Sequence, residues 1–467
     1  MRSQHLLVLA LAAALAAPAF AAAPAEVQMA AATAIGTDDA GAQGRAAFLS
    51  NGAAPALAML GAPDATEVDA VAKRRVEQRL NGQPMEIGFV RDLGEDVADS
   101  SRGALSRSGR SGILRFQLGS AEAKALRAGF ALERAGSRLG SDADAGLRAL
   151  VDQLTFRFGD ADGAFTVAGK DIALDGLYWS PVVGSESMTV EVSGPLAAVR
   201  GLRLRPVQLS HFDIDPAAPD LLQAVSAKIG ESDSCQIDSR CVTNAPSGYQ
   251  TAVDAVARMV FTQGGSSYLC TGTLLNNSNV PRRHLFWSAN HCISTQTVAN
   301  TLQTYWFYEA ASCGGTTVAT RARTLTGGAT LRHNNNSRDT LLLELKTAPP
   351  TGATYAGWSS AAIASTGTAI WGIHHPSGDV KKTSRGSVTS LSGRIDGKGP
   401  FYRVVWNSGV TEGGSSGSAL YTVTSAGQYQ LRGGLYGGLS YCSAPRDPDY
   451  YSRFSDVYAN FRTLLGN

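Results

Sequence analysis

The chain has 467 residues, of which 44% are hydrophobic and 17% charged, and its formal net charge is +2. This apolar content excludes a wholly disordered chain, and so small a net charge gives no sign of nucleic-acid binding. At about 100–200 residues per domain, the length predicts two to four domains. Residues 1–228 carry 22 Lys and Arg against 26 Asp and Glu, whereas residues 229–467 carry 19 against 13. An acidic front half and a basic back half can therefore attract each other.

Residues 1–21 have the pattern of a signal peptide. Arg2 gives a short positive region, the run Leu6–Ala17 is almost entirely Leu, Val and Ala, and Ala-Phe-Ala at 19–21 is a small-x-small cleavage pattern. The apolar run is too short for a membrane-spanning helix, and no later run reaches about 18 apolar residues. We therefore expect a secreted protein with no membrane attachment in its mature form. The alternative for this segment is a buried Ala-rich helix.

The rest of the front half divides into a lead and a more ordered core. Residues 22–80 are rich in Ala and charge, which favours a loose helical or poorly ordered lead. Between 85 and 210, short alternating runs predict half-buried strands of a small β-sandwich. These runs are Ile113–Leu118, Leu154–Phe158 and Met188–Val192. The sequence AEAKALRAGFA at 121–131 predicts one helix.

From about residue 230 the composition changes, since Gly, Ser, Thr and Asn become common. Short β-branched or aromatic runs alternate with turn residues, which predicts an all-β barrel or sandwich. A closing helix is expected to begin at Ser455 and to end before Gly466.

All six cysteines lie in this back half, at positions 235, 241, 270, 292, 313 and 442. An even number in an exported chain predicts three disulfides, although six cysteines allow 15 pairings. There is no C-x₂-C pair, so we expect no zinc site.

Three motifs in the back half suit a nucleophilic hydrolase. They are WSANHC around His291, SRDTLLLEL around Asp339 and EGGSSGS around Ser416. A serine hydroxyl is a weak nucleophile, so an imidazole must take its proton and a buried carboxylate must orient that imidazole. Each motif alone has an ordinary structural explanation, as a surface loop, a structural His beside Cys, or a strand-edge Asp. In this order and in an exported β-rich protein, they predict a catalytic triad.

The glycines around Ser416 predict a tight turn that aims backbone N–H groups at a developing oxyanion. Gly414 and Ser416 would supply these donors.

The back half resembles a known family. The motifs are CTGTLLNN at 270–277, ANHC at 289–292, IHHP at 373–376 and GVTE at 409–412. Over residues 230–467 the chain resembles trypsin-like serine proteases of chymotrypsin fold, and within them bacterial lysyl endopeptidases. The resemblance implies two six-stranded antiparallel β-barrels with a C-terminal helix, preceded by a mostly β prodomain. It also implies an endopeptidase that cleaves after Lys, with Arg as a second possibility, through an acyl-enzyme and without cofactor or metal.

The resemblance also implies a disulfide pattern and a mode of activation. The implied pairs are Cys235–Cys442, Cys241–Cys313 and Cys270–Cys292. Ordinary trypsins have Asp just before the nucleophile, where this chain has Ser415, as lysyl endopeptidases do. Without that Asp, no ion pair with a new N-terminus is available, so activation would consist of removing the front half.

The substrate pocket is expected to contain an acidic residue. Counting back from the Tyr-x-Arg segment, Asp449 falls where lysyl endopeptidases bind the substrate cation. The alternatives are a turn Asp after Pro448, or Asp447 as the pocket acid.

The pocket wall departs from the family pattern. Lysyl endopeptidases stack a His on a Trp, but here Tyr436 takes the His position and the Trp position falls near Gly393. Strict preference for Lys over Arg is therefore not expected. His374 and His375 suggest either a metal site or a packed pair typical of the family, and we favour the packed pair.

The domain prediction is a signal peptide at 1–21, a propeptide at 22–229 with its core at about 85–210, and a serine protease domain at 230–467. Cleavage after Lys228 would suit an enzyme that processes itself. We expect a monomer that acts on protein and peptide substrates and binds its own propeptide, but no nucleic acid. The alternatives are a catalytically inactive protease fold used for binding and an exported β-rich adhesin.

Overall fold

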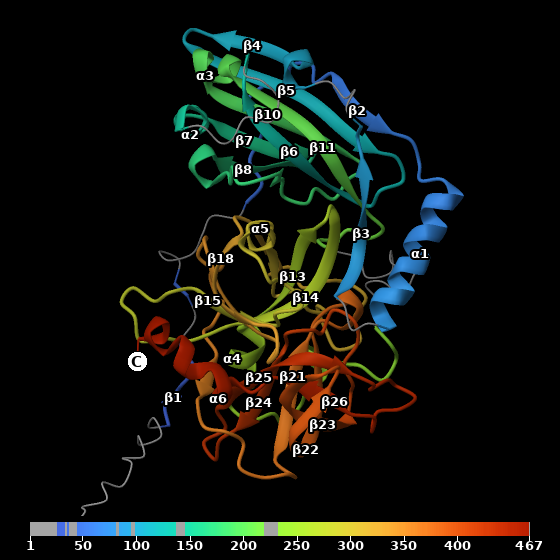
Figure 1. The fold of residues 1–467 in the computed structure, drawn as a ribbon, viewed down its shortest axis with the longest axis vertical. Coiled ribbons are helices and arrows are strands. Elements are labelled where there is room, and N and C mark those ends of the chain that lie inside the picture. The colour runs from blue at the N-terminus through green and yellow to red at the C-terminus, as the bar shows by residue number, and fades with distance from the viewer. Residues whose placement is uncertain are drawn as a thin grey trace, which may run out of the picture.

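The fold is described from a computed structural model, in which residues 26–32, 35–36, 44–80, 84–94, 99–136, 145–218 and 232–466 are described. The predicted signal peptide and the predicted mature start near residues 228–230 lie outside these residues. Strands dominate, which confirms the all-β prediction, and Figure 1 shows them in two bodies, one above the other. We call residues 26–218 the front half and residues 232–466 the back half.

Most of the front half is a sandwich of two sheets around one core. The first sheet has the order β2-β5-β10-β7-β8, with β4 also on β5. Its strands are β2 (Ala56–Leu60), β4 (Ala104–Ser108), β5 (Ser111–Ser120), β7 (Thr155–Asp160), β8 (Gly163–Ala168) and β10 (Ser187–Pro195). The second sheet contains β3 (Met85–Asp92), β11 (Leu202–Phe212), β6 (Ala125–Arg134) and β9 (Tyr178–Trp179). Leu114, Phe116 and Leu118 alternate along β5 into the core, so the predicted period of two is confirmed there.

The predicted helix at 121–131 is wrong, because strand β6 occupies most of that segment. One face of β6 packs Ala128 and Phe130 into the sandwich core, and the other packs Ala125 against the back half. A strand buried on both faces shows no alternation, so its Ala and Leu residues imitate a helix. The lead is more ordered than expected, since it contains β2 and helix α1 (Ala65–Leu80). Two short helices, α2 (Ala145–Val151) and α3 (Leu196–Gly201), complete the front half.

The back half contains two curled, mostly antiparallel sheets. The first is built from β13 (Val256–Gln263), β14 (Ser266–Leu274), β15 (Leu285–Ser288), β16 (Gln303–Trp306), β17 (Arg323–Leu325), β18 (Ala329–Asn335) and β19 (Thr340–Leu345). The second is built from β12 (Ile237–Asp238), β20 (Gly357–Ser359), β21 (Ala369–His374), β22 (Lys382–Ile395), β23 (Lys398–Ser408), β24 (Ala419–Val423), β25 (Tyr429–Gly438) and β26 (Asp449–Tyr451). Trp287, Trp358 and Phe454 belong to a core in which residues of both sheets meet. Two short helices, α4 (Tyr249–Asp254) and α5 (Gln296–Ala299), connect strands.

The predicted closing helix is short. Helix α6 (Phe454–Val457) is followed by 3₁₀ turns at Tyr458–Asn460 and Arg462–Leu465, and Gly466 ends them with φ of +80°. Three disulfides are formed, and they are the pairs that the resemblance implies: Cys235–Cys442, Cys241–Cys313 and Cys270–Cys292. In the described parts of the chain, no helix is both long and apolar enough to span a membrane.

The two halves share one sheet. Strand β3 of the front half pairs antiparallel with β14 of the back half, which makes a continuous 11-stranded sheet. A second connection lies elsewhere, since β1 (Gln28–Met29) pairs with β20. Figure 1 shows β1 and β3 on different sides of the back half.

Candidate active site

His291 and Asp339 are held together by two hydrogen bonds. Nδ1 of His291 lies 2.8 Å from Oδ2 of Asp339, and the backbone N–H of His291 donates to Oδ1 at 2.8 Å. Asp339 is fully buried just before β19, and its φ of +50° is uncommon for a residue with a side chain. The Cys270–Cys292 disulfide fixes the loop beside His291. Oδ2 therefore sets the tautomer and orientation of the imidazole, while Oδ1 anchors the backbone of the same residue.

Ser416 lies in a tight turn between β23 and β24. Gly414 has φ of +88°, and a Cβ there would lie 2.9 Å from the carbonyl oxygen of His375, so only glycine fits. The backbone N–H of Thr271 donates to the carbonyl of Ser416 at 2.8 Å, which anchors the turn on β14. Within the described chain, the N–H groups of Gly414 and Ser416 donate no hydrogen bond. Two donors are thus available where the sequence predicts an oxyanion site.

Ser416 and His291 are not hydrogen-bonded to each other in the described structure. Such contacts are often loose without substrate and tighten in the reacting complex. The disulfide Cys270–Cys292 and the contact of Thr271 with the turn bring the His and Ser loops to the middle of β14.

Asp449 is a buried carboxylate surrounded by neutral donors. Its side chain is 1% exposed, and Oδ2 accepts hydrogen bonds from Trp406 Nε1 at 2.6 Å, Thr411 Oγ1 at 2.7 Å and Ser440 Oγ at 2.8 Å. Burial raises the pKa of Asp449, while these hydrogen bonds act in the opposite direction. No Lys or Arg of the described residues forms an ion pair with it. Asp447, the alternative pocket acid, is exposed.

Comparison with known proteins identifies the family. The family model for the lysyl endopeptidase N-terminal domain matches residues 59–213, and the model for the lysyl endopeptidase C-terminal domain matches residues 229–452. A lysyl endopeptidase of Pseudomonas aeruginosa is 46% identical over 355 residues, which are 74% of this chain and 73% of that protein. The chain belongs to the lysyl endopeptidase family. It is a serine endopeptidase, and the interpretation as a β-rich adhesin is set aside.

Two solved structures also resemble part of this chain. The MamO protease domain from Magnetospirillum magneticum gives a TM-score of 0.32 at 12% identity, covering 45% of this chain and 98% of its own. An inactivated protease paralogue of the scabies mite gives 0.35 at 13% identity, covering 46% and 96%.

Compared with the family pattern, an aromatic stack is present but built from other residues. Tyr436 stacks on Phe401 with ring centroids 5.3 Å apart and an interplanar angle of 15°. Phe401 lies opposite Gly393 in the β22–β23 pairing, so the neighbouring strand places an aromatic ring beside the position where the sequence has no Trp. The ring of Tyr436 also meets His291 edge-on at 5.7 Å, and its hydroxyl donates to Asp396 at 2.9 Å. Sequence reasoning missed Phe401, because irregularities in this strand pair hide its register.

His374 and His375 form a packed pair in this family member. Nδ1 of His374 lies 2.8 Å from Ser415 Oγ, and Nε2 lies 2.9 Å from Ser384 Oγ. Both ring nitrogens are thus occupied by hydroxyls, and burial lowers the pKa of His374 to about 3, which keeps it neutral. Ser415, the residue that replaces the Asp of ordinary trypsins, therefore fixes the turn of Ser416 to β21. Neither local sequence indicates this contact, because the two residues are 41 positions apart.

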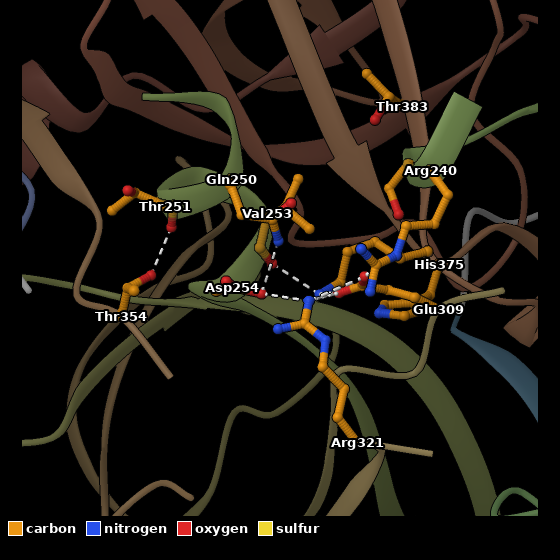
Figure 2. Close-up of polar contacts among 12 residues, drawn as sticks. Arg240, Gln250, Thr251, Val253, Asp254, Glu309, Arg321, Thr354, His375 and Thr383 are labelled. Carbon is orange, nitrogen blue, oxygen red and sulfur yellow. Dashed lines mark hydrogen bonds and ion pairs between the residues drawn. The ribbon is translucent and has the colours of Figure 1, made fainter. Parts of the chain in front are cut away.

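A buried ion-pair network supports the segment that follows His375. Arg321 donates to Asp254 at 2.7 Å and to Glu309 at 3.0 Å, and Figure 2 shows it reaching toward both. Arg240 lies 3.2 Å from Glu309, and the fully buried Lys381 lies 3.3 Å from it. Burial would raise the pKa of Glu309, but these cations outweigh it and lower the pKa. The network joins α4 to the segment between β21 and β22.

Proposed function

We propose that this chain is the inactive precursor of a secreted lysyl endopeptidase, which cleaves peptide bonds on the carboxyl side of Lys and, less well, of Arg. The observation that carries the proposal is the buried carboxylate of Asp449, which has neutral hydrogen-bond partners and no cation in the described residues. The domains proposed are a signal peptide at 1–21, a propeptide at 22–229 and a protease at 230–467. The start of the C-terminal family model at residue 229 supports the last boundary.

The proposed reaction uses Ser416, His291 and Asp339. Ser416 Oγ attacks the carbonyl carbon while His291 Nε2 takes its proton, and Asp339 stabilises the resulting imidazolium. His291 then gives the proton to the leaving amine, which leaves an acyl-enzyme on Ser416. A water molecule then attacks that ester and loses a proton to His291. His291 returns the proton to Ser416 Oγ as the acid leaves, which regenerates the free serine. The N–H groups of Gly414 and Ser416 would stabilise each oxyanion, at about 2.7–4 kcal/mol per donor.

Selection of Lys is proposed to come from the unpaired charge of Asp449. An apolar side chain in the pocket leaves that charge buried without a partner, at a cost of about 2–5 kcal/mol. A substrate ammonium supplies the partner. Arg carries the same charge on a planar fork, so the two basic substrates differ only in length and geometry. The Tyr436–Phe401 stack beside the pocket would shape this finer choice.

The inactive state is supported by the position of β3. Its Met85 is opposite Leu269 of β14, one residue before the disulfide-bonded Cys270. The Met85 side chain also lies against Gly413, since a Cβ on that glycine would be 3.6 Å from Met85 Cβ. An extended strand that adds to a sheet edge is a common way to bind peptide. The front half thus covers the edge of β14 beside the turn of Ser416.

The interface between the halves resembles a domain core. Ile87, Val182 and Phe212 of the front half pack with Leu269 and Tyr305 of the back half in one buried cluster. Polar contacts also cross the interface. Arg127 of β6 donates to Thr262 Oγ1 at 3.1 Å and to the Thr301 carbonyl at 2.6 Å, and the Ser210 and Ser267 hydroxyls are 2.9 Å apart. A core-like interface of this kind supports a propeptide that binds its protease tightly.

A serine-reactive phosphonate carrying a lysine side chain tests the proposal. We expect it to label Ser416 in the processed wild-type enzyme, and to spare both the uncut precursor and the Ser416→Ala variant. Absence of label on processed wild type would contradict an active endopeptidase. Equal labelling of Ser416→Ala would assign the nucleophile to another residue.

A further inference from the structure

The start of the described chain lies on the back half, far along the sequence from the rest of the interface. Residues 26–32, with Ile35 and Gly36, follow the edge of β20, and we call them the N-terminal strap. Strand β1 pairs antiparallel with β20, with Gln28 opposite Ser359 and Met29 opposite Trp358. In Figure 1 the strap lies at the lower left of the back half, whereas β3 lies at its upper right. The strap therefore does not belong to the contact that covers the active site.

Backbone hydrogen bonds hold the strap along its length. The Val27 N–H donates to Ser360 Oγ at 2.8 Å, and the Ser360 N–H returns a bond to the Val27 carbonyl at 2.9 Å. Further on, Ala32 and Ile35 donate to the carbonyls of Tyr355 and Ala353 at 3.0 and 2.8 Å.

A side-chain amide of the back half also forms a hydrogen bond with the strap. Asn276 Nδ2 donates to the carbonyl of Ala30 at 2.8 Å. These bonds recognise main chain in an extended conformation, which is how a sheet edge binds peptide.

The back half also buries side chains of the strap, and we call the surface on and beside β20 that the strap covers the groove. Ile35 is 5% exposed and Ala32 is 8% exposed, and both belong to the core of the first sheet of the back half. Val27 and Met29 pack against the core where the two sheets meet. Gly357 leaves the backbone room, because a Cβ there would lie 2.8 Å from both the Ala31 nitrogen and the Met29 oxygen. The strap is thus bound to the back half through buried apolar side chains as well as through main-chain hydrogen bonds.

We infer that this groove on β20 is a second peptide-binding site of the protease, separate from the catalytic site, and that its ligand is the N-terminal strap of the propeptide. The inference rests on the proposed processing near residues 228–230. Cleavage there cuts one covalent link but leaves both the strap and the β3 interface in place. Because each contact keeps the other at high local concentration, two linked contacts can hold about 10²–10⁴-fold more tightly than one. The excised propeptide therefore stays bound until the strap is released or destroyed.

The test uses the full chain and does not depend on its own activity. In a Ser416→Ala background, a recognition sequence for an unrelated, narrow-specificity protease is placed between residues 219 and 231, and the purified chain is cut with that protease. Dissociation of the front fragment after dilution is then followed by native mass spectrometry. We expect slow release with the wild-type strap and release at least 100-fold faster with Ile35→Asp. The matched control is Val68→Asp, which adds the same charge at an exposed position of α1 outside the strap and should stay within threefold of wild type.

A second arm guards against misfolding of the variant. A precursor lacking residues 22–36 in the Ser416→Ala background is mixed with a fluorescent peptide of residues 26–36. The peptide should bind this shortened chain, whose groove is free, and not the intact precursor, whose groove is filled. Equal release from the Ile35→Asp and Val68→Asp chains would overturn the inference, as would a peptide that binds neither chain or both alike. Since every cut is made externally on an inactive chain, failure here is distinct from failure of the proposed peptidase activity.

Discussion

Asp449→Asn is the substitution that most directly separates charge from shape in the pocket. The amide has nearly the same size as the carboxylate, so the contacts of Trp406, Thr411 and Ser440 keep their positions. What disappears is the charge that a substrate ammonium would meet. One hydrogen bond would be replaced by an unfavourable contact between two donors, because the Ser440 N–H, which donates to Oδ1 at 3.3 Å, would face the new NH₂ group.

The expected loss follows from the burial of this group. A buried charge pair that loses one partner costs about 2–5 kcal/mol, which corresponds to roughly 30- to 5,000-fold in kcat/KM for Lys substrates. Leu and Glu substrates, which gain nothing from the carboxylate, should not slow further.

Asp449→Asn should keep or raise the stability of the fold while it lowers activity on Lys substrates. Burial raises the pKa of Asp449, so the folded protein binds more protons than the unfolded chain between the ordinary and the raised pKa. The free energy of unfolding therefore falls as pH rises through that window, and Asn removes this loss at neutral pH. We expect Asp449→Asn to unfold at the same or a higher temperature than wild type.

The assay compares matched Lys, Arg, Leu and Glu substrates on wild type, Asp449→Asn and Asp447→Asn, with thermal unfolding of each. Asp447 is exposed two residues away and serves as the control. The reasoning is refuted if Asp449→Asn keeps Lys cleavage within threefold of wild type, or if Asp447→Asn alone abolishes it.

Three further outcomes are expected. Ser416→Ala should lower turnover on the order of 10⁶-fold with an unchanged unfolding temperature, and more than a few per cent residual activity would point to another nucleophile. N-terminal sequencing should place the mature start between residues 228 and 231, and the Ser416→Ala precursor should accumulate uncut; a start beyond Cys235 would contradict this. Phe401→Ala, which removes the partner of the Tyr436 ring, should change the Lys-to-Arg ratio of kcat/KM at least threefold, measured on paired substrates, whereas an unaltered ratio would confine the stack to a structural role.

Short sequence motifs predict much of the candidate site, because the proposed chemistry depends on residues within short runs. His291, Asp339 and Ser416 each sit in a distinctive run, and a glycine such as Gly414 is required by its own backbone angle. Counting along one segment predicts Asp449 as the pocket acid, and the structure shows that carboxylate buried among neutral donors. Phe401 could not be predicted in this way, because its position opposite Gly393 depends on a strand pair with four register shifts.

Contacts between distant segments were the least predictable part of the fold. The bond between His374 and Ser415 joins residues 41 positions apart, and nothing in either local sequence indicates it. The strap binds largely through its main chain, so its Ala-rich sequence shows little periodicity. Strand β6 was mistaken for a helix because the back half covers its second face, which only the assembled fold reveals.

The central claim is that this endopeptidase recognises Lys through Asp449. The most direct test is mass spectrometry of peptides cut from a mixed proteome by the processed enzyme. The account predicts that nearly all new carboxyl ends are Lys, that a smaller share are Arg, and that Ser416→Ala produces neither. Cleavage spread over neutral residues, or predominantly after acidic ones, would contradict it.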